Sequence, residues 1–157
     1  MKPGDLIAVA RLLIEGSNGK PSQAALRRAV STTYYALFHL LAQTGADLFV
    51  GGPGAKRSDQ AWRQVYRALE HGKAKNACKN EEMLCKFPKV IEDFGNMFVT
   101  MQEKRHLADY DPHATFSKSS VLTDIAATAK VIGDFSKAPI KDRRAFAAYV
   151  LFKTSWP

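Results

Sequence analysis

The stretch PSQAALRRAVSTTYYALFHLLAQTG, residues 21–45, is the most apolar part of this 157-residue chain and decides its fold class. One stripe of apolar residues recurs along it at helical spacing, and Tyr34 and Phe38 widen this stripe. The stripe consists of Leu26, Val30, Thr33, Leu37 and Leu41. A helix that is apolar over so much of its circumference belongs at the centre of a bundle or against a second subunit.

Apolar residues at the same spacing predict five further helices on either side of this segment. The first carries Leu6, Val9, Ala10 and Leu13 and is closed by Gly16. The others cover residues 59–71 and 87–111 and begin at about residues 117 and 139. The helix over 87–111 ends before Pro112, because the residue that precedes a proline is pushed out of the helical region.

Two segments interrupt the helices. Residues 45–59 contain four glycines and a proline and indicate an exposed loop. Residues 72–85 are polar and basic and indicate a second loop or an irregular turn. Neither strand-like alternation nor an internal repeat is present in the sequence. We therefore predict an all-α fold, an antiparallel bundle of five to six helices that forms a single domain over residues 1–157.

Composition excludes several classes of protein. The chain is 46% hydrophobic and 24% charged, which is typical of a globular domain and not of a disordered one. It has no signal peptide, and no apolar run approaches the ~20 residues that span a bilayer, so we expect a cytoplasmic protein. Cys78 and Cys85 lack the ligand spacing of a zinc site, and a disulfide between them would need an oxidising compartment. We therefore expect free, partly buried thiols.

The net charge of +8 favours polyanionic partners, and much of it lies in one stretch. Residues 56–79 hold seven bases and two acids. Arg63, Arg67 and His71 follow one another at i+4 steps on the predicted third helix, and Lys73 and Lys75 come next. This stripe is either a solvated basic edge or a track for a nucleic-acid backbone. Aromatic residues that stack on bases are not expected in it, because Trp62 and Tyr66 are assigned to the core.

Arg105 is the most informative single position. It lies at helical spacing from Phe94, Phe98 and Met101 and therefore continues the apolar face of its helix. Asp109 follows one turn later, at the spacing of an Arg–Asp ion pair. Two interpretations stay open: a half-buried salt bridge at the helix end, or an arginine directed at a phosphate in a groove.

Other signatures of catalysis are missing. The sequence contains neither a phosphate-binding glycine loop nor an HExxH zinc motif, and GGPGAK lacks the ending and the preceding strand of a P-loop. We expect no metal and no other cofactor. His113, beyond Pro112, and His39, on the same helix face as Tyr35, are the histidines that a site at Arg105 would use.

Two motifs resemble the HEPN family. ALRRAVSTTYYALFHLLA, residues 25–42, resembles the second-helix motif of one HEPN branch, and KRHLADYDP, residues 104–112, resembles the Arg-x-x-Ala-Asp-Tyr-Asp-Pro ending of that branch. The resemblance implies a helical bundle that forms a homodimer with its functional cleft at the interface. Many members are metal-independent ribonucleases in toxin–antitoxin or defence systems, and others bind RNA or nucleotides or act as partners of a nucleotidyltransferase.

The chain departs from the catalytic motif of the active members, in which a histidine follows the arginine after four to six residues. Arg105 corresponds to that arginine, but positions 110–112 hold no histidine, and the best match in its place is Asp109, after only three residues. An ionised aspartate beside an arginine is a poor proton donor. Three hypotheses follow. In the first, the chain binds RNA, a nucleotide or a nucleotidyltransferase partner through a cleft near Arg105. In the second, it is a ribonuclease with a rearranged site, in which Arg105 and Asp109 act with His113, His39 or His71. In the third, it is a non-catalytic interaction protein.

Overall fold

The computed structural model describes residues 1–16 and 19–153. Within these residues the chain is helical and contains no strand. Eight helices are present among them: α1 (Pro3–Glu15), α2 (Gln23–Phe49), α3 (Asp59–Arg67), α4 (His71–Lys79), α5 (Glu81–Leu84), α6 (Lys89–Tyr110), α7 (Lys118–Lys137) and α8 (Ile140–Leu151). The all-α prediction is confirmed, but five to six helices were too few.

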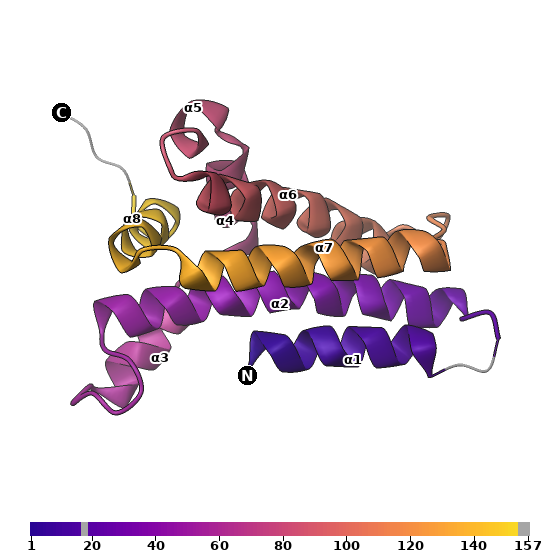
Figure 1. The fold of residues 1–157 in the computed structure, drawn as a ribbon, viewed down its shortest axis with the longest axis horizontal. Helices are drawn as coiled ribbons and strands as arrows, with labels where there is room; N and C mark the ends of the chain where they lie inside the picture. The colour runs from indigo at the N-terminus through magenta and orange to yellow at the C-terminus, as the bar shows by residue number, and fades with distance from the viewer. Residues whose placement is uncertain (17–18, 154–157) are drawn as a thin grey trace.

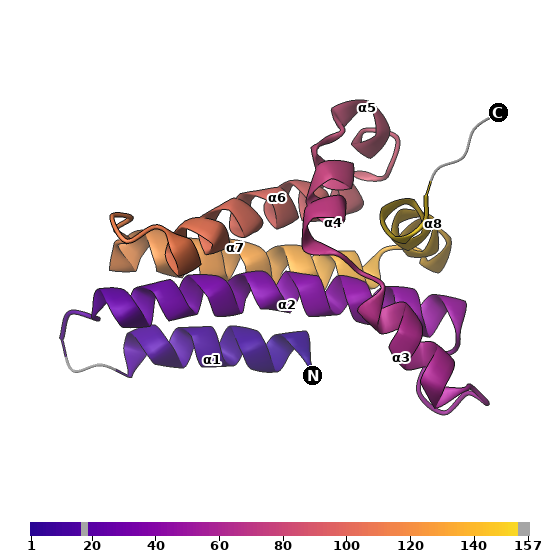
Figure 2. The ribbon, with the colours of Figure 1, turned by 180° about the vertical axis from the view of Figure 1, so that it is seen from behind.

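Four helices run side by side and form the body of the molecule: α1, α2, α6 and α7 (Figures 1 and 2). Helix α2 is central, because it contacts α1, α6 and α7 along its length and α3 and α8 near its C-terminal end. The apolar stripe predicted for this segment is buried, with Tyr34, Leu37 and Leu41 fully inaccessible. None of the helices described is long and apolar enough to cross a membrane.

Aromatic side chains fill the core between α6, α7 and α8. The rings of Phe94 and Phe135 stack with their centroids 4.3 Å apart, and Phe146 packs against both. All three side chains are fully buried. Each contributes about 1.5–3 kcal/mol by leaving water, so this cluster fixes the last helix firmly against the bundle.

Helix α2 continues four residues beyond the predicted boundary at Gly45. Gly45 lies inside this helix, at a close approach to α8, because a Cβ at Gly45 would lie only 2.6 Å from Leu151 Cδ1. Gly45 is therefore a contact point between two helices and not the first residue of a loop. The loop itself begins later, and Gly51 and Gly54 there adopt positive φ values of 143° and 83°.

The prediction that residues 72–85 form a loop is wrong, because they fold as α4 and α5. Small residues give α4 its buried face: Ala74 and Cys78, four positions apart, are inaccessible where α4 meets α6 and α8. Asn80 then caps α5 by accepting a hydrogen bond from the Met83 backbone N–H at 3.3 Å. Both cysteines are free, as expected, but only Cys78 is buried, and burial raises the pKa of its thiol to about 12.

Helix α1 covers only part of α2 and thereby leaves room for a surface site. Its buried residues are Ile7, Ala10 and Ile14, whereas Val9, expected on the inner face, is 46% exposed. The N-terminal end of α1 lies near the middle of α2, and α3 crosses α2 beyond it (Figures 1 and 2). Tyr35 and His39 of α2 line one hollow with Leu6 of α1, and His39 is also hydrogen-bonded to Tyr66 of α3.

Candidate nucleic-acid interface

Arg105 lies on the buried side of α6 and forms the predicted pair with Asp109. Its Nη1 donates a hydrogen bond to Asp109 Oδ2 at 3.4 Å, and the whole residue is only 9% exposed. Asp109 is more accessible, and its Oδ1 accepts a hydrogen bond from the hydroxyl of Ser31 on α2. The carboxylate is therefore held between α2 and α6 by one partner from each helix.

Two tyrosines of α2 enclose the Arg105 guanidinium. Its central carbon lies 5.2 Å from the ring centroid of Tyr34 and 5.8 Å from that of Tyr35, within the range of cation–π attraction. Burial disfavours the charge, but Tyr35, Asp109 and Tyr34 outweigh it and hold the pKa of Arg105 above its usual value. Arg105 Nε is buried and has no hydrogen-bond partner among the described residues.

Arg27, which was not among the predicted site residues, supports this site from α2. Its Nη1 donates to the carbonyls of Ala108 and Asp111 at 2.9 and 2.8 Å. Its Nη2 donates to the carbonyls of Pro112 and Ala114 at 3.3 and 2.5 Å. These bonds satisfy carbonyls at and beyond the C-terminus of α6 and fix the helix end that carries Asp109. The one available signal was the Arg27–Arg28 pair inside the most apolar helix.

His71 does not continue a basic stripe from α3, so that prediction is wrong. Helix α3 ends at Arg67, Leu69 is buried, and His71 begins α4 in a different direction. The His71 ring stacks on Phe38 with centroids 4.1 Å apart, and its Nδ1 is hydrogen-bonded to the Tyr34 hydroxyl at 2.6 Å. Burial, followed by the nearby Arg105 charge, lowers the pKa of this histidine.

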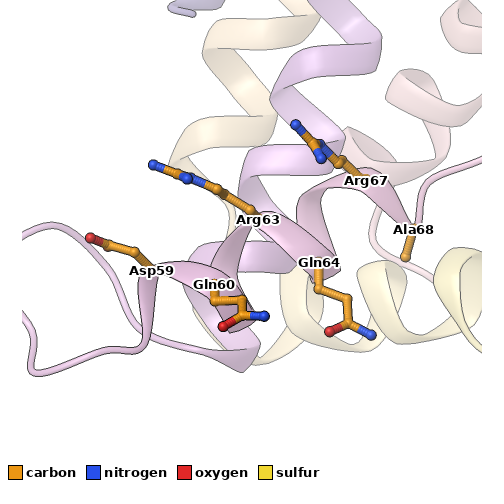
Figure 3. A pocket seen from close by; sticks show the side chains of 6 residues that line it. All are labelled: Asp59, Gln60, Arg63, Gln64, Arg67 and Ala68. Carbon is orange, nitrogen blue, oxygen red and sulfur yellow. The ribbon is translucent and has the colours of Figure 1, made fainter.

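The aromatic residues of α3 were predicted to lie in the core, but they are only partly buried, and Tyr66 packs against the edge of the core. No residue of α3 is buried, and Trp62 and Tyr66 are half-exposed and stack on each other at 5.1 Å. Figure 3 shows Arg63 and Arg67 extending from one side of α3, away from Gln60 and Gln64. Within the described residues neither arginine forms an ion pair, so their charges stay available to a ligand.

His39 joins the two helices at this surface. Its Nδ1 is hydrogen-bonded to the Tyr66 hydroxyl at 2.5 Å, and its ring stacks on Tyr66 with centroids 5.8 Å apart. On the other side it lies 6.1 Å from the ring of Tyr35, the neighbour expected from the sequence. Burial, followed by the positive N-terminal amine, lowers the pKa of His39. Its ordinary state at neutral pH is therefore the uncharged imidazole.

The remaining predicted residues lie apart from this surface. Lys73 Nζ donates to the carbonyl of Leu151 at 3.2 Å, and Lys75 forms an ion pair with Glu103 at 3.4 Å. Both lysines thus contact α8 or α6. His113 is exposed beyond the end of α6, and its backbone N–H donates to the Asp111 carboxylate at 2.8 Å. No contact between His113 and Arg105 occurs in the part of the chain described.

Overlapping hollows connect these residues into one surface. A hollow of about 360 Å³ is lined by Met1, His39, Trp62, Arg63, Tyr66 and Arg67. Arg63 and Arg67 also border a larger one of about 830 Å³ (Figure 3). In the other direction, a hollow of about 260 Å³ contains His39 and Tyr35. We call this surface the α2–α3 face; it comprises Tyr35, His39, Trp62, Arg63, Tyr66 and Arg67.

A fourth hollow, of about 480 Å³, begins where the α2–α3 face ends. Tyr35 belongs to both, and the hollow continues over Arg28 and Ser31 to Asp109 and Tyr110. Arg28 is exposed and has no ion-pair partner among the described residues. Three unpaired arginines, Arg28, Arg63 and Arg67, therefore flank a row of half-exposed rings. Such an arrangement is suited to binding an extended polyanion that also carries flat, stackable groups.

No group of three or more histidine, cysteine, aspartate or glutamate residues within 1–16 and 19–153 is arranged to hold a metal ion. In comparisons with known proteins, no family profile, no curated protein and no solved structure matches this chain. The resemblance to HEPN domains is therefore carried by the two sequence motifs alone and stays a prediction.

Proposed function

We propose that this protein binds single-stranded RNA along the α2–α3 face. The observation that carries the proposal is the row of half-exposed rings of Trp62, Tyr66, His39 and Tyr35, bordered by arginines without ion-pair partners. These rings partly stack on one another, and Arg57 lies over Trp62, so bases would stack on the accessible parts of the row. Each base stacked in this way contributes about 1–3 kcal/mol, whatever its identity. Bases in a duplex are already stacked on one another and cannot reach these rings, which is why the proposal specifies a single strand.

Electrostatics supports the same ligand. The net charge of +8 attracts polyanions over a long range, and Arg63 and Arg67 project from one side of α3 (Figure 3). Two arginines that each neutralise one phosphate of a single strand change the slope of log K against log salt by about 1.4. Arg105 contributes differently, because it is buried beneath this surface and holds Tyr35 and Asp109 in place.

Fluorescence anisotropy with a labelled uridine dodecamer tests the proposal. We expect the Arg63→Gln/Arg67→Gln variant to bind more weakly and with a shallower salt dependence. The matched control is Lys141→Gln/Arg144→Gln, which removes the same charge from two exposed positions of α8. Equal losses in both variants would attribute binding to net charge and contradict a defined face. Equal affinity for the dodecamer and for its duplex with an adenosine dodecamer would also contradict it.

A metal-independent ribonuclease is the second candidate, and His39 is the observation that favours it. Its imidazole has a lowered pKa, lies on the proposed RNA surface and contacts Tyr35, whose ring contacts Arg105. An uncharged imidazole can accept the proton of a ribose 2′-hydroxyl. RNA cleavage that persists in EDTA and disappears in His39→Asn, but not in His113→Asn, would establish this activity. Intact RNA after incubation with native protein would contradict it.

The two sequence motifs support membership of the HEPN family as part of this proposal, with a role in a toxin–antitoxin or defence system beside a nucleotidyltransferase. A homodimer belongs to the same proposal. Val9 and Leu12, three positions apart on α1, are 46% and 67% exposed and are suitable for a contact between two copies. Light scattering of the native protein and of Val9→Ser/Leu12→Ser would test the dimer, and a monomeric native protein would contradict it.

A further inference from the structure

We propose that the hollow beside the end of α6 binds one base of the RNA, that this base is guanine, and that Asp109 recognises it. The inference rests on the proposed RNA-binding function and adds base specificity to it. The hollow has a volume of about 480 Å³ and is lined by Arg28, Ser31, Tyr35, Asp109 and Tyr110, among others. This volume lies within the range of about 300–1,000 Å³ that is typical of small-molecule sites.

The Asp109 carboxylate is oriented but not saturated. Oδ1 accepts one hydrogen bond from Ser31 and Oδ2 accepts one from Arg105, and the side chain is 31% exposed. A carboxylate offers about four acceptor positions, so each oxygen keeps one free position. The guanidinium of Arg105 is itself fixed between α2 and α6, which prevents the carboxylate from rotating freely. A ligand that fits here must offer two neighbouring donors.

Guanine is the base whose Watson–Crick edge meets that requirement. It presents the N1–H and the 2-amino group side by side, and both donate. Adenine and cytosine place an acceptor next to their amino group, and uracil flanks its single N–H with two carbonyls. A carboxylate facing any of those three bases therefore has an acceptor opposite an acceptor, which is repulsive. The pair with guanine is bidentate and charge-assisted, the strongest kind of hydrogen-bonded contact.

Neighbouring side chains complete the site. Tyr35 and Tyr110 supply rings at the hollow on which a purine can stack, and Tyr110 is 66% exposed. Arg28 has no ion-pair partner in the described part of the chain and lies on the same hollow, in reach of the phosphate that accompanies the base. Because Tyr35 also lines the α2–α3 face, one strand can occupy both surfaces.

The test compares three uridine octamers that carry guanosine, inosine or adenosine at one central position. Inosine lacks only the 2-amino group, so it probes one hydrogen bond without altering the protein. We expect the guanosine octamer to bind at least about fivefold more tightly than the adenosine octamer, with inosine between them. In Asp109→Asn one acceptor becomes a donor, and the preference for guanosine should disappear.

The matched control is Asp134→Asn, which neutralises an aspartate that also belongs to an i,i+4 ion pair. Asp134 lies on α7 and does not line the hollow. It should keep the preference for guanosine, and thermal unfolding of both variants shows whether each is folded. Equal binding of the three octamers by native protein would overturn the inference and leave RNA binding intact, as would a guanosine preference that survives in Asp109→Asn. Absence of binding to any octamer at low salt would overturn the proposed function itself.

Discussion

Arginines occur in two regions of this molecule that differ in burial and in ion pairing. Arg105 lies between α2 and α6, where two tyrosine rings and a carboxylate surround its charge. Arg63 and Arg67 project from α3 into solvent and have no ion-pair partner among the described residues (Figure 3). A buried charge must be compensated within the protein, whereas an exposed one is already compensated by water and stays free to exchange that water for a phosphate.

In this molecule position, and not residue type, separates a stabilising arginine from a ligand-binding one. Arg105 has the surroundings of a residue that holds other groups in place, and its Asp109 partner is the more accessible member of the pair. Removal of Arg105 should therefore act mainly on stability, and removal of the α3 arginines should act mainly on binding.

The largest effect is expected for Arg105→Ala. It removes one partner of a largely buried ion pair and empties the space between Tyr34 and Tyr35, so we expect the free energy of unfolding to fall by about 3 kcal/mol. Urea denaturation followed by circular dichroism measures this loss. Arg105→Met, which keeps the apolar stem, should recover part of it. Unchanged stability combined with lost RNA cleavage would show that Arg105 acts on the ligand and not on stability, and would favour the ribonuclease hypothesis.

Arg27→Met should have the next largest effect. The four carbonyl oxygens that its guanidinium binds would turn to water, and we expect a loss of about 2 kcal/mol because the donors are charged. Relative to the native protein, amide hydrogen exchange in the variant should accelerate at the C-terminal end of α6 more than at its N-terminal end. Arg28→Met is the control on the same helix, and a similar loss there would show that the contacts of Arg27 are not the cause.

Arg63→Gln/Arg67→Gln should leave the unfolding free energy within about 0.5 kcal/mol of the native value, because both side chains are exposed. The effect should appear in binding, as a salt slope that is shallower by about 1.4. Titration of a labelled uridine dodecamer at several salt concentrations measures it. A large loss of stability in this variant would indicate that the arginines pack against the bundle after all.

The smallest expected effect is on how the free energy of unfolding depends on pH, through His39 and His71. The pKa values of His39 and His71 are lowered in the folded protein, mainly by burial, from an ordinary value of 6.5. The unfolded chain therefore binds more protons below about pH 6.5, so stability is full above that pH and falls as the pH decreases. His39→Gln/His71→Gln should flatten this dependence between about pH 7.5 and 5.5. His106→Gln/His113→Gln, at exposed positions, should not.

Periodicity in the sequence located the long helices correctly. Helix α2 followed from an apolar stripe too wide for a surface helix, and α6 ended at Tyr110, immediately before Asp111 and Pro112, as expected. The pairing of Arg105 with Asp109 also followed from spacing alone, because residues four apart on one helix face are neighbours whatever the tertiary fold. These features depend on interactions within a few residues of the chain.

Short helices with small residues escaped the same reasoning. Helix α4 has only Ala74 and Cys78 on its buried face, which gives a weak periodic signal, and its stability comes from packing against α6 and α8. Trp62 and Tyr66 were assigned to the core because they share a helix face with Val65 and Leu69. Helix α3 instead projects from the C-terminal half of α2, where no other helix covers it (Figure 2).

Local patterns in the sequence determined the helical class, restricted α2 to the centre of a bundle or a subunit contact, and indicated an ion pair as one of two roles for Arg105. Only the tertiary structure decided which side chains meet between helices: His39 with Tyr66, His71 with Tyr34 and Phe38, and Asp109 with Ser31. The physical reason is the distance along the chain over which each kind of interaction acts. Helix formation and i,i+4 pairing act within a turn or two, whereas a binding surface depends on how packed helices bring together residues that are distant along the chain.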